Sequence, residues 1–178
     1  MPLDLQGRTV LVVGLARSGV AAARLASERG ARVVATDRRQ AGDLAGPLRA
    51  LAGLPVSLAL GGHDAAHFTG ADLVVVSPGV PMSIPEIAAA RRAGVAVWAE
   101  VELAARFLGD LPLVAITGTN GKGSVAAALA SMLSAAGHKT GSYYSPHIVM
   151  YNERFKIDGI EITDSEFAPY EEILLRMH

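Results

Sequence analysis

Short apolar runs alternate with amphipathic stretches along the first 113 residues of the chain. The apolar runs predict five strands, over Arg8–Val13, Arg32–Thr36, Val56–Leu60, Leu73–Val76 and Val95–Ala99. Between them, apolar residues at helical spacing predict helices over Val20–Arg29, Leu44–Leu51, Ile84–Arg92 and Glu100–Leu108. Strands that alternate with helices in this way indicate an α/β fold, with a parallel sheet covered by helices on both faces.

A second strand-and-helix pattern begins near residue 113. The apolar run Leu113–Thr117 predicts a buried strand, and a helix is expected over Val125–Ala136. Shorter elements are expected after that helix: a strand over Lys139–Ser142, a hairpin turn at Asp158-Gly159 and a capping box at Thr163–Glu166 that opens a last helix. The pattern therefore predicts two parts, with the boundary close to residue 113.

Composition narrows the class of protein. The chain has 178 residues, is 51% hydrophobic, carries a net charge of −1 and contains no cysteine. The lack of cysteine excludes disulfides and thiolate metal sites, and the charge does not favour non-specific binding to nucleic acid. Because no apolar run is long enough to span a bilayer and Met1–Arg8 lacks the layout of a signal peptide, we expect a cytoplasmic protein. All lysines lie after residue 113, which indicates either a domain boundary or two ancestries.

Two loops follow the first two predicted strands, at the edge of a parallel sheet where ligands bind. Gly14–Gly19 has the pattern G-x-A-x-x-G, which fits an anion-binding turn or a plain tight turn, with Ser18 as the helix cap in both cases. Asp37 lies where an acidic residue contacts ribose in dinucleotide-binding folds. With Arg38 and Arg39 it predicts a turn that contacts sugar and phosphate, or else a solvated charged turn.

A third loop and two histidines complete the candidates in the first part. Ser77-Pro78-Gly79 follows the fourth predicted strand, and it fits either a backbone amide that faces a ligand or a rigid turn. His63 and His67 are four residues apart, which is a helical spacing for metal ligands. Without a third ligand we interpret them as surface histidines.

The strongest chemical motif is Gly118–Ser124, with the sequence GTNGKGS between a predicted strand and a predicted helix. Glycines allow backbone N–H groups to turn toward an anion, and the helix N-terminus adds partial positive charge. Lys122 has the length to reach terminal phosphates, and the Ser124 hydroxyl can bind Mg²⁺. A plain glycine-rich turn is the alternative, although a lysine has little structural reason to lie inside one.

These motifs together resemble the Mur ligase superfamily of ATP-dependent amide-bond ligases. VLVVGLARSG, TDRR, LVVVSPGVP and WAEVELAARF in the first part resemble the N-terminal domain of the MurD family, the UDP-N-acetylmuramoyl-L-alanine:D-glutamate ligases. The resemblance implies a Rossmann-like domain over residues 1–112 that binds a UDP-sugar rather than NAD. The residues implied at that site are Gly14, Leu15, Ala16, Arg17, Ser18, Gly19, Asp37, Arg38, Ser77, Pro78 and Gly79. Ala16 departs from the usual second glycine.

The second part is similar to a sister family. TGTNGKGS, YYSPHI, NERF and IDGIEITDSEF resemble folylpolyglutamate synthase, and Gly123 stands where MurD-type loops carry a hydroxyl residue after the lysine. Residues 113–178 would then form part of a P-loop ATP-binding domain. The residues implied at that site are Gly118, Thr119, Asn120, Gly121, Lys122, Gly123 and Ser124. The two resemblances together imply a composite chain, either a natural hybrid or an engineered chimera.

Both families imply one reaction, in which ATP phosphorylates a carboxylate and an amino acid attacks the acyl phosphate. Lys122 would be catalytic, Ser124 would bind Mg²⁺, and the substrates would be an amino acid with a UDP-sugar peptide precursor of peptidoglycan or a folate. Neither nucleic acid nor membrane is implied as a partner. Because whole family members are far longer, we expect the chain that ends at His178 to bind ligands weakly and not to turn over alone. A folylpolyglutamate synthase, a non-catalytic nucleotide-binding module and an NAD-dependent oxidoreductase are the alternatives, the last disfavoured by Ala16.

Overall fold

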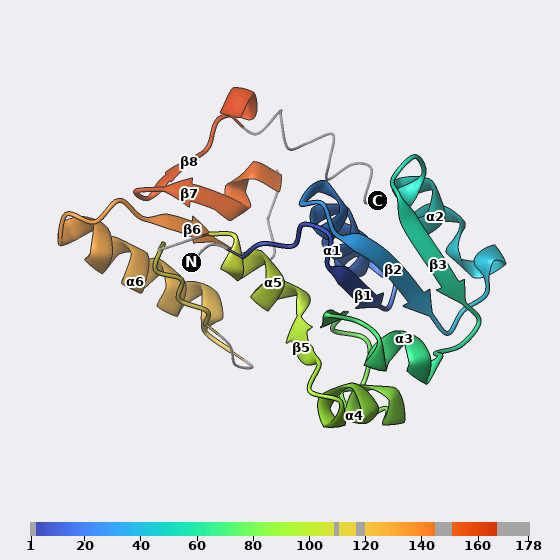
Figure 1. Cartoon of the computed structure of the whole chain (residues 1–178). Coiled ribbons are helices and arrows are strands. Elements are labelled where there is room, and N and C mark those ends of the chain that lie inside the picture. Colours follow the sequence, from blue (N-terminus) through green and yellow to red (C-terminus); the bar gives the residue numbers. More distant parts are fainter. Residues whose placement is uncertain (1–2, 109–110, 117–119, 145–150, 167–178) are drawn as a thin grey trace. The chain divides into compact units, whose positions relative to one another are not determined.

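The chain divides into two compact units, with the change from one to the other between Leu111 and Pro112. Figure 1 shows a computed structural model of the whole chain, coloured along the sequence. The structure describes residues 3–108, 111–116, 120–144 and 151–166. The two units are described separately below.

A parallel sheet of five strands, in the order β3-β2-β1-β4-β5, forms the centre of the first unit. The strands are β1 (Thr9–Val13), β2 (Arg32–Asp37), β3 (Val56–Leu60), β4 (Leu73–Val76) and β5 (Ala96–Ala99). The helices are α1 (Arg17–Glu28), η1 (Ala41–Leu44), α2 (Ala45–Leu51), α3 (Ala65–Thr69), α4 (Pro85–Arg92) and α5 (Glu100–Arg106). The predicted α/β fold with a Rossmann-like parallel sheet is confirmed, and β3 and β4 have the predicted bounds.

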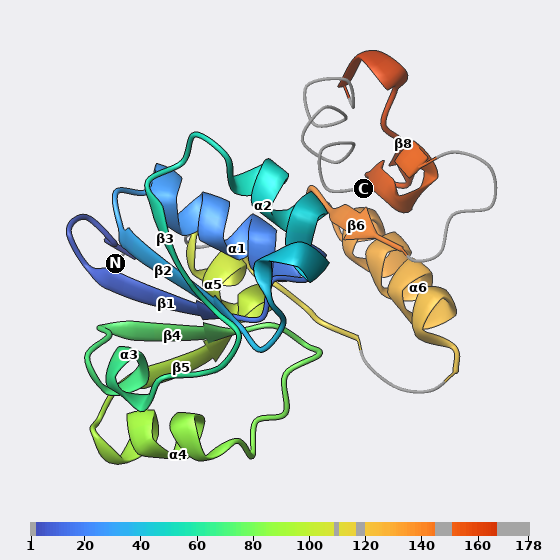
Figure 2. The ribbon, with the colours of Figure 1, turned by 90° about the vertical axis from the view of Figure 1, so that its right-hand side faces the viewer.

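The central strands β1 and β4 are buried on both faces of the sheet, which explains why their sequences are continuous apolar runs. Val10 and Val12 of β1 face one core, which α1, α2 and α5 complete. Leu11 and Val13 alternate with them and face a second core, which α3 and α4 complete. All four side chains are fully buried. Figure 2 shows the two groups of helices on opposite sides of the strands.

In the described residues of the second unit, helix α6 accompanies a small antiparallel sheet, in the order β6-β7-β8. Its elements are α6 (Lys122–Ala135), β6 (Gly141–Tyr143), η2 (Tyr151–Arg154), β7 (Phe155–Ile157) and β8 (Ile160–Glu161). The predicted hairpin is confirmed: Asp158 and Gly159 both have positive φ, which suits the turn between two paired strands. The predicted capping box is also confirmed, because the Thr163 N–H donates to Glu166 Oε2 at 2.8 Å and the Glu166 N–H donates to Thr163 Oγ1 at 3.3 Å.

The predicted strand over Leu113–Thr117 is wrong for the residues that the structure describes. Residues 113–116 are not in a strand, Leu113 and Val114 are 57% and 60% exposed, and Thr117 lies outside the described residues. A buried parallel strand requires neighbouring strands and helices over both faces. No strand in the described ranges pairs with 113–116, so the apolar run alone does not establish a strand.

Helix α3 was missed from the sequence because it is short and follows a glycine turn. Asp64 caps this helix, and its side chain accepts the Ala66 N–H at 2.9 Å. The sequence signal for this helix was an aspartate, a favoured N-cap residue, directly before two alanines. The helix matters for packing because it places Phe68, which is fully buried, in the second core.

Candidate functional site at the carboxyl edge of the parallel sheet

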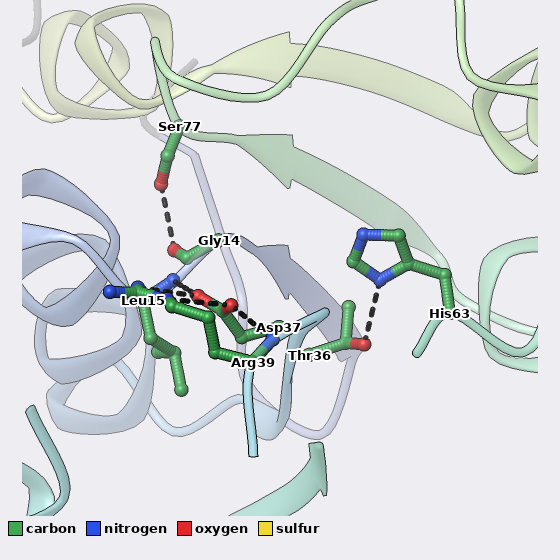
Figure 3. Close-up of polar contacts among 7 residues, drawn as sticks. All are labelled: Gly14, Leu15, Thr36, Asp37, Arg39, His63 and Ser77. Carbon is green, nitrogen blue, oxygen red and sulfur yellow. Dashed lines mark hydrogen bonds and ion pairs between the residues drawn. The ribbon is translucent and has the colours of Figure 1, made fainter. Parts of the chain in front are cut away.

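The predicted loops of the first unit meet at one edge of the sheet. Val13 at the end of β1 is in register with Thr36 of β2 and with Val76 of β4. The residues that follow these strands, including Gly14–Gly19 and Ser77-Pro78-Gly79, therefore share the carboxyl edge, where open parallel sheets bind their ligands. Figure 3 shows the hydrogen bonds that Ser77 and Asp37 make with Gly14 and Leu15.

Asp37 is buried and holds two parts of its own chain. Its Oδ2 accepts the backbone N–H of Leu15 at 2.8 Å and the Arg39 Nη2 at 2.8 Å. Its Oδ1 accepts the Arg39 backbone N–H at 2.9 Å and the Arg39 Nε at 3.0 Å. The sequence-based prediction named Arg39 in this turn but did not include it among the site residues. The spacing was the available signal, since an aspartate side chain in a turn often accepts the backbone N–H of the residue two positions on.

These contacts keep Asp37 ionised. Burial by itself would raise the pKa of the carboxyl group, but the hydrogen bonds from the Arg39 side chain and from the Leu15 and Arg39 amides outweigh it and lower the pKa to about 2. The acceptor positions of both oxygens are thus used within the chain. The predicted contact between Asp37 and a nucleotide sugar gains no support from this geometry. Arg38, also predicted at the site, is exposed at the same edge.

Ser77 is buried on the other side of the same loop. Its hydroxyl donates to the Gly14 carbonyl at 2.8 Å. Pro78 and Gly79, which follow it, are exposed. Within this tripeptide, Ser77 therefore holds the Gly14 loop by a hydrogen bond, whereas the other two residues are exposed.

Packing requires glycine at the first and last positions of the Gly14–Gly19 loop. Gly14 has φ of +90°, and a Cβ there would lie 2.8 Å from Val80 Cγ2. A Cβ on Gly19 would lie 1.8 Å from the Gly14 carbonyl oxygen and 2.6 Å from Ser77 Oγ. Helix α1 therefore begins in direct contact with the end of β1, and these two glycines serve the turn itself.

The N-terminus of α1 lies exposed at this edge. Ala16 is the residue before the helix, and no side chain caps it. The predicted cap by Ser18 is wrong, because Ser18 lies in the first turn, beyond the position from which a hydroxyl reaches the first helical amides. Ala16 and Arg17 are exposed and Ser18 is half-buried. The first backbone N–H groups of a helix carry partial positive charge and have no partners within the helix.

His63 lies on the other side of β2 from Asp37, and it is half-buried rather than a surface residue as predicted. Its Nδ1 is 3.0 Å from the Thr36 hydroxyl, and its ring meets Phe68 edge-on at 5.7 Å. Burial lowers its pKa, and the nearby charge of Arg38 lowers it further, against the opposing effects of Glu86 and Asp37. A cavity of about 290 Å³ at the end of β3 is lined by residues 59–64. His67 is exposed, as predicted.

The second candidate site is described only in part. Gly118 and Thr119 lie outside the described residues, and Asn120 is exposed. Gly121 has φ of +75° and immediately precedes α6, with no side chain as a cap. Lys122 and Ser124 both lie in the first turn of α6, so the structure brings the two predicted phosphate and Mg²⁺ residues to one helix N-terminus.

Gly123, between them, lines a cavity in the second unit. This cavity has a volume of about 510 Å³ and lies between α6 and the β7–β8 hairpin.

Within the described ranges, no group of three or more acidic or histidine side chains is arranged to hold a metal ion. No helix in those ranges is both long and apolar enough to cross a bilayer.

A comparison with protein families identifies the family to which the first unit is related. The model described as "Mur ligase MurD-like, N-terminal domain" matches residues 8–99, which include all five strands and the loops after β1, β2 and β4. The chain belongs to this family. The resemblance to Mur ligases seen in the sequence is thus confirmed.

Curated relatives of this MurD-like chain are named as ligases. It is 64% identical over 133 residues to the UDP-N-acetylmuramoylalanine–D-glutamate ligase of Anaeromyxobacter dehalogenans, covering 74% of this chain and 28% of that protein. It is 47% identical over 168 residues to the ligase of the same name from Geobacter metallireducens, covering 93% of this chain and 37% of that protein. The chain therefore spans about a third of the length of these relatives.

Among solved structures, the MurD-like chain is similar to the UDP-N-acetylmuramate-alanine ligase MurC of Thermotoga maritima. The TM-score is 0.46 at 19% sequence identity, and the match covers 96% of this chain and 45% of that one.

Proposed function

We propose that this chain is part of a UDP-N-acetylmuramoyl-L-alanine:D-glutamate ligase, an ATP-dependent amide-bond ligase of peptidoglycan synthesis. The observation that carries the proposal is the 64% identity over 133 residues with a curated ligase of that name. Residues 1–112 would bind the UDP-sugar, and residues 113–178 would supply part of the ATP site. A cytoplasmic location, and small-molecule substrates rather than nucleic acid or membrane, belong to the same proposal.

The carboxyl edge of the first unit supports a role in binding a diphosphate. The N–H groups of Ala16, Arg17 and Ser18 open an uncapped helix of twelve residues, a favourable place for an anion. Arg38 adds an exposed guanidinium group, and Pro78 and Gly79 give an exposed turn on the far side of the loop. We therefore place the diphosphate at Ala16–Ser18.

The second unit supports a role for Lys122 and Ser124 at the phosphates of ATP. The left-handed Gly121 and the uncapped start of α6 fit a phosphate group, and the Ser124 hydroxyl is a suitable oxygen ligand for Mg²⁺. When bound, ATP and Mg²⁺ supply the phosphoryl group and neutralise its charge. Lys122 would then hold the transferred phosphoryl group in place by its charge.

Folylpolyglutamate synthase remains the second candidate for residues 113–178, with a non-catalytic nucleotide-binding module as the third. The match to the Geobacter metallireducens ligase covers 93% of the chain, so it extends well past residue 113. If the whole chain descends from a MurD-type ligase, that coverage is explained and no hybrid of two families is needed. The first candidate is therefore favoured.

Calorimetric titration of the chain with UDP, NAD and ATP·Mg²⁺ tests the proposal. We expect UDP to bind and NAD not to bind, because the acceptor positions of Asp37 that would meet a ribose are filled by Leu15 and Arg39. Lys122→Ala should weaken ATP·Mg²⁺ binding and leave UDP binding unchanged. Binding of NAD without binding of UDP would contradict the UDP-sugar assignment. ATP·Mg²⁺ binding that is insensitive to Lys122→Ala would contradict the assignment of the second site.

A further inference from the structure

Two residues directly before α6 form a pair that can react within the chain. Asn120 is followed by Gly121, whereas the other asparagine of the chain, Asn152, is followed by Glu153. An asparagine carboxamide can be attacked by the backbone nitrogen of the next residue, and the side chain of that residue hinders the attack. Because glycine has no Cβ, an Asn-Gly pair has the least hindrance.

The structure leaves this pair accessible. Asn120 and Gly121 are both exposed, and neither lies in a helix or a strand, because α6 begins at Lys122. Gly121 has φ of +75°, and a Cβ at that position would have no atom within 4 Å. Within the described residues, no hydrogen bond is made by the Asn120 carboxamide or by the Gly121 N–H. Both reacting groups are therefore in contact with solvent and are not held apart.

A second pair that ends in glycine, Asp158-Gly159, provides a contrast within the same chain. Asp158 Oδ1 accepts the Thr140 N–H at 2.7 Å, and the Asp158 N–H donates to the Thr140 carbonyl at 2.8 Å. The carboxylate is thus held by its neighbour, and an ionised carboxylate is a poorer electrophile than a carboxamide. The same ring closure is therefore disfavoured at Asp158 and favoured at Asn120.

We propose that Asn120 is a modification site, at which the chain deamidates spontaneously through a cyclic imide formed with Gly121. The Gly121 nitrogen gives its proton to water or hydroxide and bonds to Asn120 Cγ. The bond from Cγ to the side-chain nitrogen breaks, and that nitrogen takes a proton from solvent and leaves as ammonia. One water molecule then opens the imide at either carbonyl carbon. The products are aspartate, or isoaspartate with the backbone running through Cγ.

Either product places a negative charge directly before α6. Lys122 and Ser124 lie in the first turn of this helix, where we place the phosphates of ATP, so this consequence rests on the proposed function. A carboxylate at a helix N-terminus interacts favourably with the same backbone N–H groups that bind a phosphate. Deamidation therefore supplies a competing anion from the chain itself, and it weakens the binding of ATP·Mg²⁺.

Peptide mass spectrometry of the full chain, incubated in mild base without nucleotide, tests the modification by itself. We expect the peptide that contains Asn120 to gain about one dalton and to contain isoaspartate, and the peptide that contains Asn152 to change about tenfold more slowly. Folding should slow the reaction at Asn120 by less than about fivefold relative to the chain in guanidinium chloride, because the pair is exposed and not hydrogen-bonded. Stronger protection by folding, or equal rates at Asn120 and Asn152, would overturn the proposal.

Two glycine variants separate this chemistry from a change in the helix. Gly121→Ala adds a Cβ next to Asn120 and should slow its deamidation about tenfold. Gly137→Ala is the matched control, because Gly137 follows the other end of α6, has φ of +87° and also has open space for a Cβ. It imposes a similar backbone strain and should leave the rate at Asn120 unchanged. Equal rates at Asn120 in the two variants would contradict the proposed route.

Asn120→Asp, which carries the charge of the product, tests the effect on the nucleotide. We expect it to bind ATP·Mg²⁺ about tenfold more weakly than the unsubstituted chain. Met132→Glu adds the same charge at a position of α6 that is 69% exposed, and it should bind ATP·Mg²⁺ as the unsubstituted chain does. Equal affinities of Asn120→Asp and the unsubstituted chain would overturn the effect on the nucleotide. If the unsubstituted chain does not bind ATP·Mg²⁺, the proposed function of the second unit fails, and the mass measurements alone decide the modification.

Discussion

Gly19→Ala should lower the free energy of unfolding of the first unit by about 3 kcal/mol. The new Cβ would lie 1.8 Å from the Gly14 carbonyl oxygen, which belongs to the backbone and is itself bound by Ser77. The helix must therefore move away from the end of β1. For a unit of this size, the melting temperature should fall by roughly 10–20 °C.

The fluorescence of Trp98 provides the measurement for Gly19→Ala. It is the only tryptophan of the chain, it packs against the first core and Arg106 lies over its ring at 4.7 Å, so it reports on the first unit. Gly46→Ala is the matched control: Gly46 lies in α2, and an added Cβ there has open space. That variant should be neutral or slightly stabilising. Equal urea midpoints for the two variants would contradict the packing described at Gly19.

Asp37 should make the first unit sensitive to acid. Its pKa is about 2 in the folded chain and 3.8 ordinarily, so its contribution to stability is present above pH 4 and is lost as the pH falls through about 2. The shift corresponds to about 2 kcal/mol. In urea titrations, the unsubstituted chain should exceed Asp37→Asn in stability by about this amount at pH 7, and the difference should shrink between pH 4 and pH 2.

Asp72→Asn separates this effect from a general response to acid. Asp72 is exposed, so replacing it should cost less stability at pH 7 than replacing Asp37. A difference between the unsubstituted chain and Asp37→Asn that stays constant from pH 7 to pH 2 would show that Asp37 is not the titrating group.

The sequence predicted the first unit well because its signals are local. β-Branched runs bounded by glycine identified the strands, and their alternation with helices determined the parallel sheet and hence the edge where the loops meet. The roles of the residues at that edge were harder to predict from the sequence. Nothing local shows that Ser77 and Asp37 bind the same peptide, because the hydrogen bonds join residues 63 and 22 positions apart.

The predictions for the second part were weaker for a related reason. An apolar run such as Leu113–Thr117 becomes a strand only if other strands pair with it, and the run itself carries no information about its neighbours. The hairpin turn at Asp158-Gly159 and the capping box at Thr163–Glu166 were correct, since each depends on residues within four positions of one another.

The most direct test of the central claim, a nucleotide diphosphate site at the carboxyl edge of the first unit, is an amide chemical-shift titration of the chain with UDP. The account predicts the largest shifts at Ala16, Arg17 and Ser18, with Thr9 and Asp72 at the amino edge unchanged. Shifts that are absent at Ala16–Ser18, or that are as large at Thr9 and Asp72, would contradict it.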